Sequence, residues 1–166
     1  MIAGTATMIT VERTRDYELI RRVMTNPRIY PSITDDFSAS ATDFQPVCDD
    51  RLIYLAAKDG QTFLGIMLFA PENGIELRVH HFFLPIAWGK PALEAVRVGI
   101  EWIWANTRYK RLFGKTPAFN RLALRFAKRV RFQVCGIDIA SIQKDGRLWD
   151  QILFGMSRPG VFDHGN

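Results

Sequence analysis

The sequence predicts an α/β (α+β) fold, a three-layer sandwich in which helices cover a mixed, mostly antiparallel central sheet. Apolar runs of strand length are joined by short glycine-containing turns, and other segments have apolar residues at helical spacing. These segments follow one another as strand, helix, loop, three strands, helix, strand, helix and two strands. This order is typical of helices packed on a central sheet.

The first part of the chain combines one strand, one helix and a long loop. Residues 8–12 alternate well enough for a strand, and Thr14 or Asp16 can cap the helix that follows. Asn26 and Pro27 end that helix. Residues 28–50 contain scattered prolines and aromatic residues, and we expect a loop with one short helix at 35–39.

The middle of the chain predicts an antiparallel meander of three strands. Two apolar runs, 52–57 and 62–69, flank an Asp-Gly pair, which is a strong hairpin signal. The sequence APENG then turns the chain into a third apolar strand at 75–84.

A glycine-containing turn and a long amphipathic helix follow this third strand. Residues 85–92 hold Trp88, Gly89 and Lys90 between two prolines, and the helix after them has an apolar stripe. A strand that leads through such a turn into a helix presents unpaired N–H groups and the positive end of the helix dipole. The turn is therefore a candidate phosphate-binding site, although one glycine also permits an ordinary tight turn.

The last third of the chain predicts a strand at 111–115, a helix at 118–130 and a closing hairpin. The two strands of this hairpin cover residues 132–143 and 147–156, and the sequence KDG joins them.

Composition limits the possible classes of protein. The 166 residues fit one domain, 1–166, and 48% hydrophobic residues exclude a disordered chain. The net charge of +5 favours an anionic partner, such as nucleotide phosphates, nucleic acid or an acidic protein. Met8 is a second candidate start, so we expect residues 1–7 to be a disordered or start-site extension.

Cysteine use and hydropathy predict a cytoplasmic protein without a membrane segment. Cys48 and Cys135 are the two cysteines, and they form no CxxC motif and no cluster with the histidines. We therefore expect neither a disulfide framework nor a metal site. The N-terminus does not resemble a signal peptide, and no later segment reaches about 18 uninterrupted apolar residues.

The turn resembles the pyrophosphate loop of the GNAT acyltransferase superfamily, whose members typically read V-x-P-x-x-R-G-x-G/A. Pro85 and Gly89 are in register with that pattern, and Lys90 is a frequent choice between its two small residues. Two positions depart from it. Trp88 replaces the usual arginine, and Pro91, which has no N–H to offer a phosphate, replaces the second small residue.

A second stretch supports the resemblance. Asn120, Ala123, Phe126 and Phe132 are similar to the GNAT pattern N-x-x-A-x-x-L/F…G-F, and KDGRLWD at 144–150 resembles the last hairpin. The likeness covers roughly residues 8–158. Here Ala127 replaces the tyrosine that serves as general acid in many members, and Arg131 replaces the usual glycine before Phe132.

The resemblance implies an N-acyltransferase that uses acetyl-CoA, or another acyl-CoA, and an amine on a small molecule or a protein. It implies that pantetheine adds beside the third strand of the meander, while the diphosphate meets the turn. Asn120 is a candidate pantetheine contact or, equally, a helix cap. The expected cofactor-binding residues are Phe82, Phe83, Leu84, Trp88, Gly89, Lys90, Pro91, Ala92 and Asn120.

Two residues of the same strand are candidates for the general base. Period-two alternation places Glu76 and His80 on one face, and imidazole titrates near neutral pH. Arg78 between them can instead pair with Glu76. His81 lies in an apolar row, where a hydrogen-bonded core histidine is expected. With Ala127 unable to donate a proton, the leaving thiolate needs Tyr109, Tyr54 or water.

Two other functions and one mode of assembly remain open. The departures at Trp88, Pro91 and Ala127 are compatible with a GNAT-like binding or phage-type accessory protein that has lost cofactor use. A basic cluster on the second long helix offers contacts to nucleic acid, but no nucleic-acid motif accompanies it, which favours a solvated face. A homodimer is compatible with the sequence. The cluster contains Arg121, Arg125, Lys128, Arg129 and Arg131.

Overall fold

The computed structural model describes residues 8–161, and their strands and helices follow the predicted order. In chain order they are β1 (Ile9–Arg13), α1 (Tyr17–Met24), α2 (Tyr30–Ile33), β2 (Ile53–Asp59), β3 (Thr62–Pro71), β4 (Glu76–Phe83), the 3₁₀ turn η1 (Pro85–Ala87), α3 (Lys90–Asn106), β5 (Arg111–Pro117), α4 (Arg121–Arg129), β6 (Gln133–Lys144) and β7 (Arg147–Ser157).

The N-terminal part agrees with expectation at the start of α1 and differs from it in the position of the short helix. The short helix predicted at 35–39 is wrong, because the helical turn is α2 at Tyr30–Ile33, and residues 35–38 instead form a turn closed by Asp35 and Ser38. Asp16 caps α1, since its carboxylate accepts from the N–H of Leu19 at 2.9 Å. The expected extension at residues 1–7 lies outside the described part of the chain.

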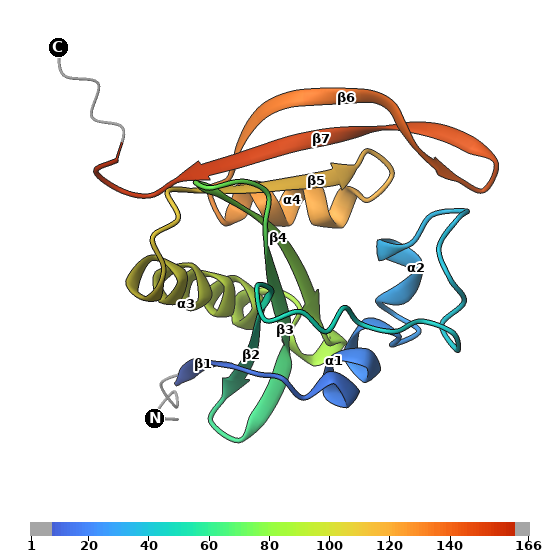
Figure 1. Ribbon diagram of the computed structural model, residues 1–166. Coiled ribbons are helices and arrows are strands. Elements are labelled where there is room, and N and C mark those ends of the chain that lie inside the picture. Colours follow the sequence, from blue (N-terminus) through green and yellow to red (C-terminus); the bar gives the residue numbers. More distant parts are fainter. Residues whose placement is uncertain (1–7, 162–166) are drawn as a thin grey trace, which may run out of the picture.

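The strands form one sheet in the order β1-β2-β3-β4-β5-β7-β6 (Figure 1). All neighbouring pairs are antiparallel except β4 and β5, which are parallel, so the predicted mixed, mostly antiparallel sheet is confirmed. The predicted meander is β2, β3 and β4, and Gly60 with a φ of 56° forms the tight turn of its first hairpin.

Helices cover both faces of this sheet, which confirms the three layers. On one face, α3 and α4 pack on β4 residues such as Leu77 and Val79. On the other face, α1 packs on Ile66 and Phe82. Successive β4 side chains thus enter opposite cores, as the period of two requires. Within residues 8–161, no helix combines the length and the apolar character needed to cross a membrane.

Arg131 ends α4 in a backbone conformation that normally favours glycine. Its φ is 75°, its N–H donates to the carbonyl of Lys128 at 3.0 Å, and the N–H of Phe132 donates to the carbonyl of Ala127 at 3.0 Å. These two bonds form a Schellman motif, whose left-handed residue is usually glycine. The arginine found in place of the GNAT glycine is therefore strained.

We expect Arg131→Gly to raise the free energy of unfolding by about 1 kcal/mol, because the left-handed conformation costs an L residue roughly that amount. Arg125→Gly is the matched control, since it removes an exposed arginine from the interior of α4. The control should lower stability by about 1 kcal/mol. Urea unfolding of both variants measures the effect, and equal signs would contradict this account of Arg131.

Candidate functional site

The chain passes from β4 to α3 through a turn that requires glycine. Gly89 precedes α3 with φ 101° and ψ −131°, a conformation that side chains with a Cβ rarely adopt. A Cβ built on Gly89 would meet no atom within 4 Å, so the space in front of it is open. Pro91 lies in the first turn of α3, where its missing N–H breaks no helical bond.

Several main-chain N–H groups at this turn have no acceptor. Within residues 8–161, no hydrogen bond is formed by the N–H of Gly89, Lys90 or Ala92. Trp88 differs, because its N–H donates to the carbonyl of Pro85 at 3.2 Å, and Pro91 has no N–H. Of the residues expected to contact the diphosphate, Gly89, Lys90 and Ala92 are therefore those with a free main-chain N–H group.

The charge at this helix end is positive and unbalanced. The first turn of α3 contains no acidic residue, and Lys90 is exposed there. A lysine at the positive end of a helix dipole is unfavourable unless an anion is near. The free amides, the open space and the charge together fit a phosphate group.

The edge of β4 that faces β5 has no strand partner near this turn, which makes it an open edge of the sheet. Pairing between the two strands ends at Arg78 and Phe113, while β4 continues to Phe83, so the strands meet at one end and then diverge (Figure 1). The N–H of Leu84 donates to Leu64 of β3 at 2.9 Å. Because main-chain groups alternate in direction, those of His81 and Phe83 point toward the β5 side.

This alternation corrects part of the predicted pantetheine site. The main-chain groups of Phe82 and Leu84 point toward β3, and the side chains of Phe82 and Phe83 are buried in opposite cores. Phe83 thus faces the open edge with its main chain, together with His81. An extended ligand can add to such an edge as another strand.

Trp88 closes the end of this edge. Its indole N–H donates to the carbonyl of Phe83 at 2.9 Å, while 46% of the residue stays exposed. Beyond the paired segment, the N–H and carbonyl of His81 and the N–H of Phe83 have no strand partner among residues 8–161. The residue that replaces the usual arginine therefore fixes the junction between open strand and turn.

His80 lies on the face of β4 that carries Phe82, as the alternation predicts. Its ring stacks on Phe82 with centroids 6.2 Å apart and planes 6° apart, and the residue is exposed. Desolvation by its neighbours, and then the nearby charge of Arg78, lower the pKa of His80 below the ordinary value of 6.5. At neutral pH its imidazole is uncharged and can accept a proton.

Glu76, the other candidate base, is engaged elsewhere. Its carboxylate pairs with the guanidinium of Arg111 on β5, and its side chain is only 13% exposed. Arg78 pairs with Glu72 at 2.6 Å, so the alternative pairing of Arg78 with Glu76 is wrong. Glu76 also lies about 13 Å from His80 along the strand. Of the two candidate bases, His80 is the one whose side chain forms no ion pair among residues 8–161.

His81 belongs to the core on the α3 and α4 side. Its ring lies 5.7 Å from Phe126 and 6.3 Å from Phe83, centroid to centroid. Burial lowers the pKa of His81 to about 3, so the ring is neutral. Nε2 is buried and has no hydrogen-bond partner among residues 8–161, which corrects the expectation of a hydrogen-bonded core histidine.

The hydroxyl of Tyr54 is already engaged, and Tyr109 lies at the other end of α3 from the turn. The hydroxyl of Tyr54 donates to the carbonyl of Val47 at 3.1 Å, and burial raises the pKa of Tyr54 to about 12. Tyr109 follows the far end of α3, a helix of 17 residues, and that length corresponds to about 25 Å.

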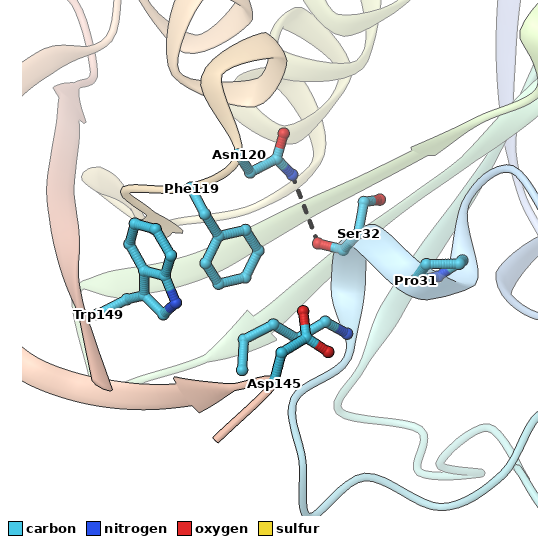
Figure 2. A pocket seen from close by; sticks show the side chains of 7 residues that line it. Pro31, Ser32, Phe119, Asn120, Asp145 and Trp149 are labelled. Atoms are coloured by element: carbon cyan, nitrogen blue, oxygen red, sulfur yellow. Dashed lines mark hydrogen bonds between the residues drawn. The ribbon is translucent and has the colours of Figure 1, made fainter. Parts of the chain in front are cut away.

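Asn120 caps α4. Its Oδ1 accepts from the N–H of Ala123 at 3.1 Å, and its Nδ2 donates to the carbonyl of Ser32 at 3.4 Å (Figure 2). The helix-cap alternative is confirmed. A pantetheine contact by Asn120 stays a prediction.

Asn120 also lines a pocket of about 340 Å³ that the sequence did not predict. Figure 2 shows the rings of Phe119 and Trp149 side by side on one wall, and their centroids lie 5.5 Å apart, edge to face. The sequence signals near this pocket were Asn120 of the N-x-x-A pattern and the resemblance of KDGRLWD to a GNAT hairpin. Its walls come from α2, the turn before α4 and the β6–β7 hairpin, through Pro31, Ser32, Phe119, Asn120, Lys144, Asp145 and Trp149.

Asp36 fastens the loop after α2 to the tip of this hairpin. Its carboxylate accepts from the N–H groups of Asp145 at 2.7 Å and Gly146 at 2.8 Å, and from the side chain of Gln143 at 3.1 Å. The hydrogen bond from Gly146 is the main cause that lowers the pKa of Asp36. The carboxylate thus helps to hold one pocket wall to another, together with the bond from Lys144 Nζ to the carbonyl of Thr34 at 3.0 Å.

We expect Asp36→Asn to destabilise the protein at pH 7, because the amide loses the charge-assisted bonds. A lowered folded pKa stabilises the native state above the unfolded pKa, and this contribution is lost as pH falls through the folded value. Urea unfolding should therefore separate wild type from variant at pH 7, and the gap should narrow as pH falls below 3.8, the ordinary pKa of an aspartate. Asp50→Asn, which affects an exposed pair with Arg15, is the control; a gap for Asp36→Asn that does not narrow in acid would refute this role.

The basic cluster of α4 is exposed, and none of its members forms an ion pair within residues 8–161. The described residues also include no group of three or more histidine, cysteine, aspartate or glutamate side chains that could hold a metal ion.

Solved structures with a similar fold include several N-acetyltransferases. Spermidine N-acetyltransferase from Vibrio cholerae, in complex with CoA and spermine, superposes with a TM-score of 0.74 at 14% identity, covering 90% of this chain and 95% of that one. Ribosomal-protein-S5-alanine acetyltransferase from Vibrio fischeri superposes with a TM-score of 0.73 at 13% identity, covering 96% of this chain and 98% of that one. An N-acetyltransferase from Staphylococcus aureus Mu50 superposes with a TM-score of 0.69 at 14% identity, covering 90% of this chain and 97% of that one.

No family model matches the sequence, and no curated protein matches it. At these low identities the structural likeness establishes the fold. The chain has the fold of the GNAT N-acetyltransferases, as a divergent example of it.

Proposed function

We propose that this chain is an N-acyltransferase that binds acetyl-CoA, or another acyl-CoA, and transfers the acyl group directly to an amine. The observation that carries the proposal is the set of unpaired N–H groups on Gly89, Lys90 and Ala92, at a helix start directly after a strand with one open edge. This combination suits a ligand that has both a diphosphate and an extended amide-containing arm.

The main chain would hold the donor. The diphosphate would accept hydrogen bonds from Gly89, Lys90 and Ala92, with the ammonium group of Lys90 nearby. The pantetheine amides would bond the edge of β4 at His81 and Phe83. That a protein of the same fold is known in complex with CoA supports this pose.

His80 would act as the base. The amine nitrogen attacks the thioester carbonyl carbon, the new C–N bond forms, and His80 takes the proton that the nitrogen loses. The C–S bond breaks as the tetrahedral intermediate collapses, and CoA leaves as a thiolate. The lowered pKa keeps His80 uncharged at neutral pH, so its imidazole is free to take this proton.

The leaving group does not require a protein acid. An ordinary thiol has a pKa of about 8.5, so a thiolate is a tolerable leaving group near neutral pH and can take a proton from water. The absence of a hydroxyl at Ala127 therefore slows this step without preventing it. The pocket at Phe119 and Trp149 would receive part of the acceptor.

Calorimetry tests the proposal. The wild-type chain should bind acetyl-CoA and desulfo-CoA with similar affinity, since phosphate and amide contacts are common to both. No heat of binding at millimolar ligand would rule out the proposal.

Donor binding without transfer is the second candidate, and Ala127 favours it. It predicts the same calorimetry but no release of thiol from acetyl-CoA with any of a panel of amines. Release of thiol that depends on an added amine excludes this candidate.

A further inference from the structure

Arg28, in the loop between α1 and α2, lies over the residue that begins the donor turn. Its guanidinium carbon is 5.5 Å from the centroid of the Trp88 ring, within the range of a cation–π contact. Both partners are held in place. The indole N–H donates to Phe83, the N–H of Arg28 donates to the side chain of Asn26 at 2.9 Å, and the next residue, Ile29, is only 5% exposed.

The guanidinium is not neutralised by a carboxylate. Among residues 8–161, Arg28 takes part in no salt bridge, and the first turn of α3 contains no acidic residue. Arg28, Lys90 and the positive end of α3 therefore place three positive contributions around one turn. Such an arrangement is stable when an anion binds among them.

The residue type at position 88 indicates what the contact with Arg28 can do. Trp88 occupies the position where the GNAT pattern has arginine, so the turn lacks a guanidinium of its own. Arg28 brings one to the same place from a distant segment of the chain. The contact with the indole places the guanidinium beside Trp88, and its N–H donors form no hydrogen bond among residues 8–161, so a phosphate could accept two of them.

We propose that Arg28 binds the diphosphate of the acyl-CoA donor and that Trp88 serves as the platform that orients it. This inference rests on the proposed function, because it assigns a ligand group within the same donor site. It predicts that affinity for the diphosphate depends on a residue outside the turn.

Calorimetry on variants tests the assignment. Arg28→Ala should weaken CoA binding about tenfold or more, the size expected for the loss of charge-assisted hydrogen bonds. Arg28→Lys should recover only part of the affinity, because a lysine keeps the charge but not the planar fork. Arg22→Ala is the matched control, since it removes an exposed arginine from α1 and should bind like wild type.

Three ligands identify the phosphate. Dephospho-CoA lacks the 3′-phosphate and keeps the diphosphate, so Arg28→Ala should weaken its binding as much as that of CoA. Pantetheine lacks both groups, so its affinity should be the same for Arg28→Ala and wild type. A loss for CoA alone would assign Arg28 to the 3′-phosphate and overturn the proposal, as would wild-type affinity in Arg28→Ala. Failure of the wild type to bind CoA would instead refute the proposed function. Thermal unfolding confirms that each variant is folded.

Discussion

Gly89→Asp should abolish binding of acetyl-CoA. The substitution places a carboxylate in the open space in front of the turn, where the diphosphate would approach the N–H groups of Gly89, Lys90 and Ala92. Two like charges at that distance repel, and the new Cβ also blocks the close approach of the phosphate. We expect no measurable heat at ligand concentrations that saturate the wild type.

Backbone strain must be separated from this effect. Gly89 has a φ of 101°, so any side chain there costs about 1 to 3 kcal/mol of stability. Gly60→Asp is a suitable control, because Gly60 also has a positive φ, of 56°, has open space around it, and lies in the β2–β3 hairpin. Gly60→Asp should bind acetyl-CoA with the affinity of the wild type. Unchanged affinity in folded Gly89→Asp would refute the donor site.

His80→Gln should lower kcat roughly 10²- to 10⁴-fold, the usual contribution of a general base, while the Kd for acetyl-CoA stays unchanged. Glutamine keeps a polar side chain on the strand but cannot take the proton of the amine. Steady-state rates with an active amine and calorimetry with acetyl-CoA measure the two quantities separately.

The pH dependence and a second variant identify the base. Because the pKa of His80 lies below 6.5, the wild-type kcat/KM should fall on the acid side of that value, as the imidazole becomes protonated. This limb should vanish in His80→Gln, whereas the rise in rate as the amine loses its own proton at higher pH should remain. If kcat falls in Glu76→Gln and not in His80→Gln, the base is Glu76 and the assignment of His80 is wrong.

The fold was predictable because its signals are local. Apolar runs around Gly60, the stripe of the long helix and the alternation of β4 each follow from the spacing of neighbouring residues. Such spacing places His80 and Phe82 on one face of β4 and His81 and Phe83 on the other, as found.

The site was less predictable because its decisive contacts join distant segments. Nothing near Glu76 in the sequence indicates that Arg111 takes its carboxylate, and nothing near Trp88 indicates Arg28. The hydrogen bonds of the Asp36 carboxylate likewise depend on a distant hairpin tip, because Asp36 and Asp145 are 109 residues apart in the sequence. Tertiary packing alone brings these partners together.

A crystal structure of the wild-type chain with desulfo-CoA tests the central claim most directly. The account predicts the diphosphate against the N–H groups of Gly89, Lys90 and Ala92, and the pantetheine arm along the open edge of β4 at His81 and Phe83. A ligand bound elsewhere, with this turn empty, would contradict it.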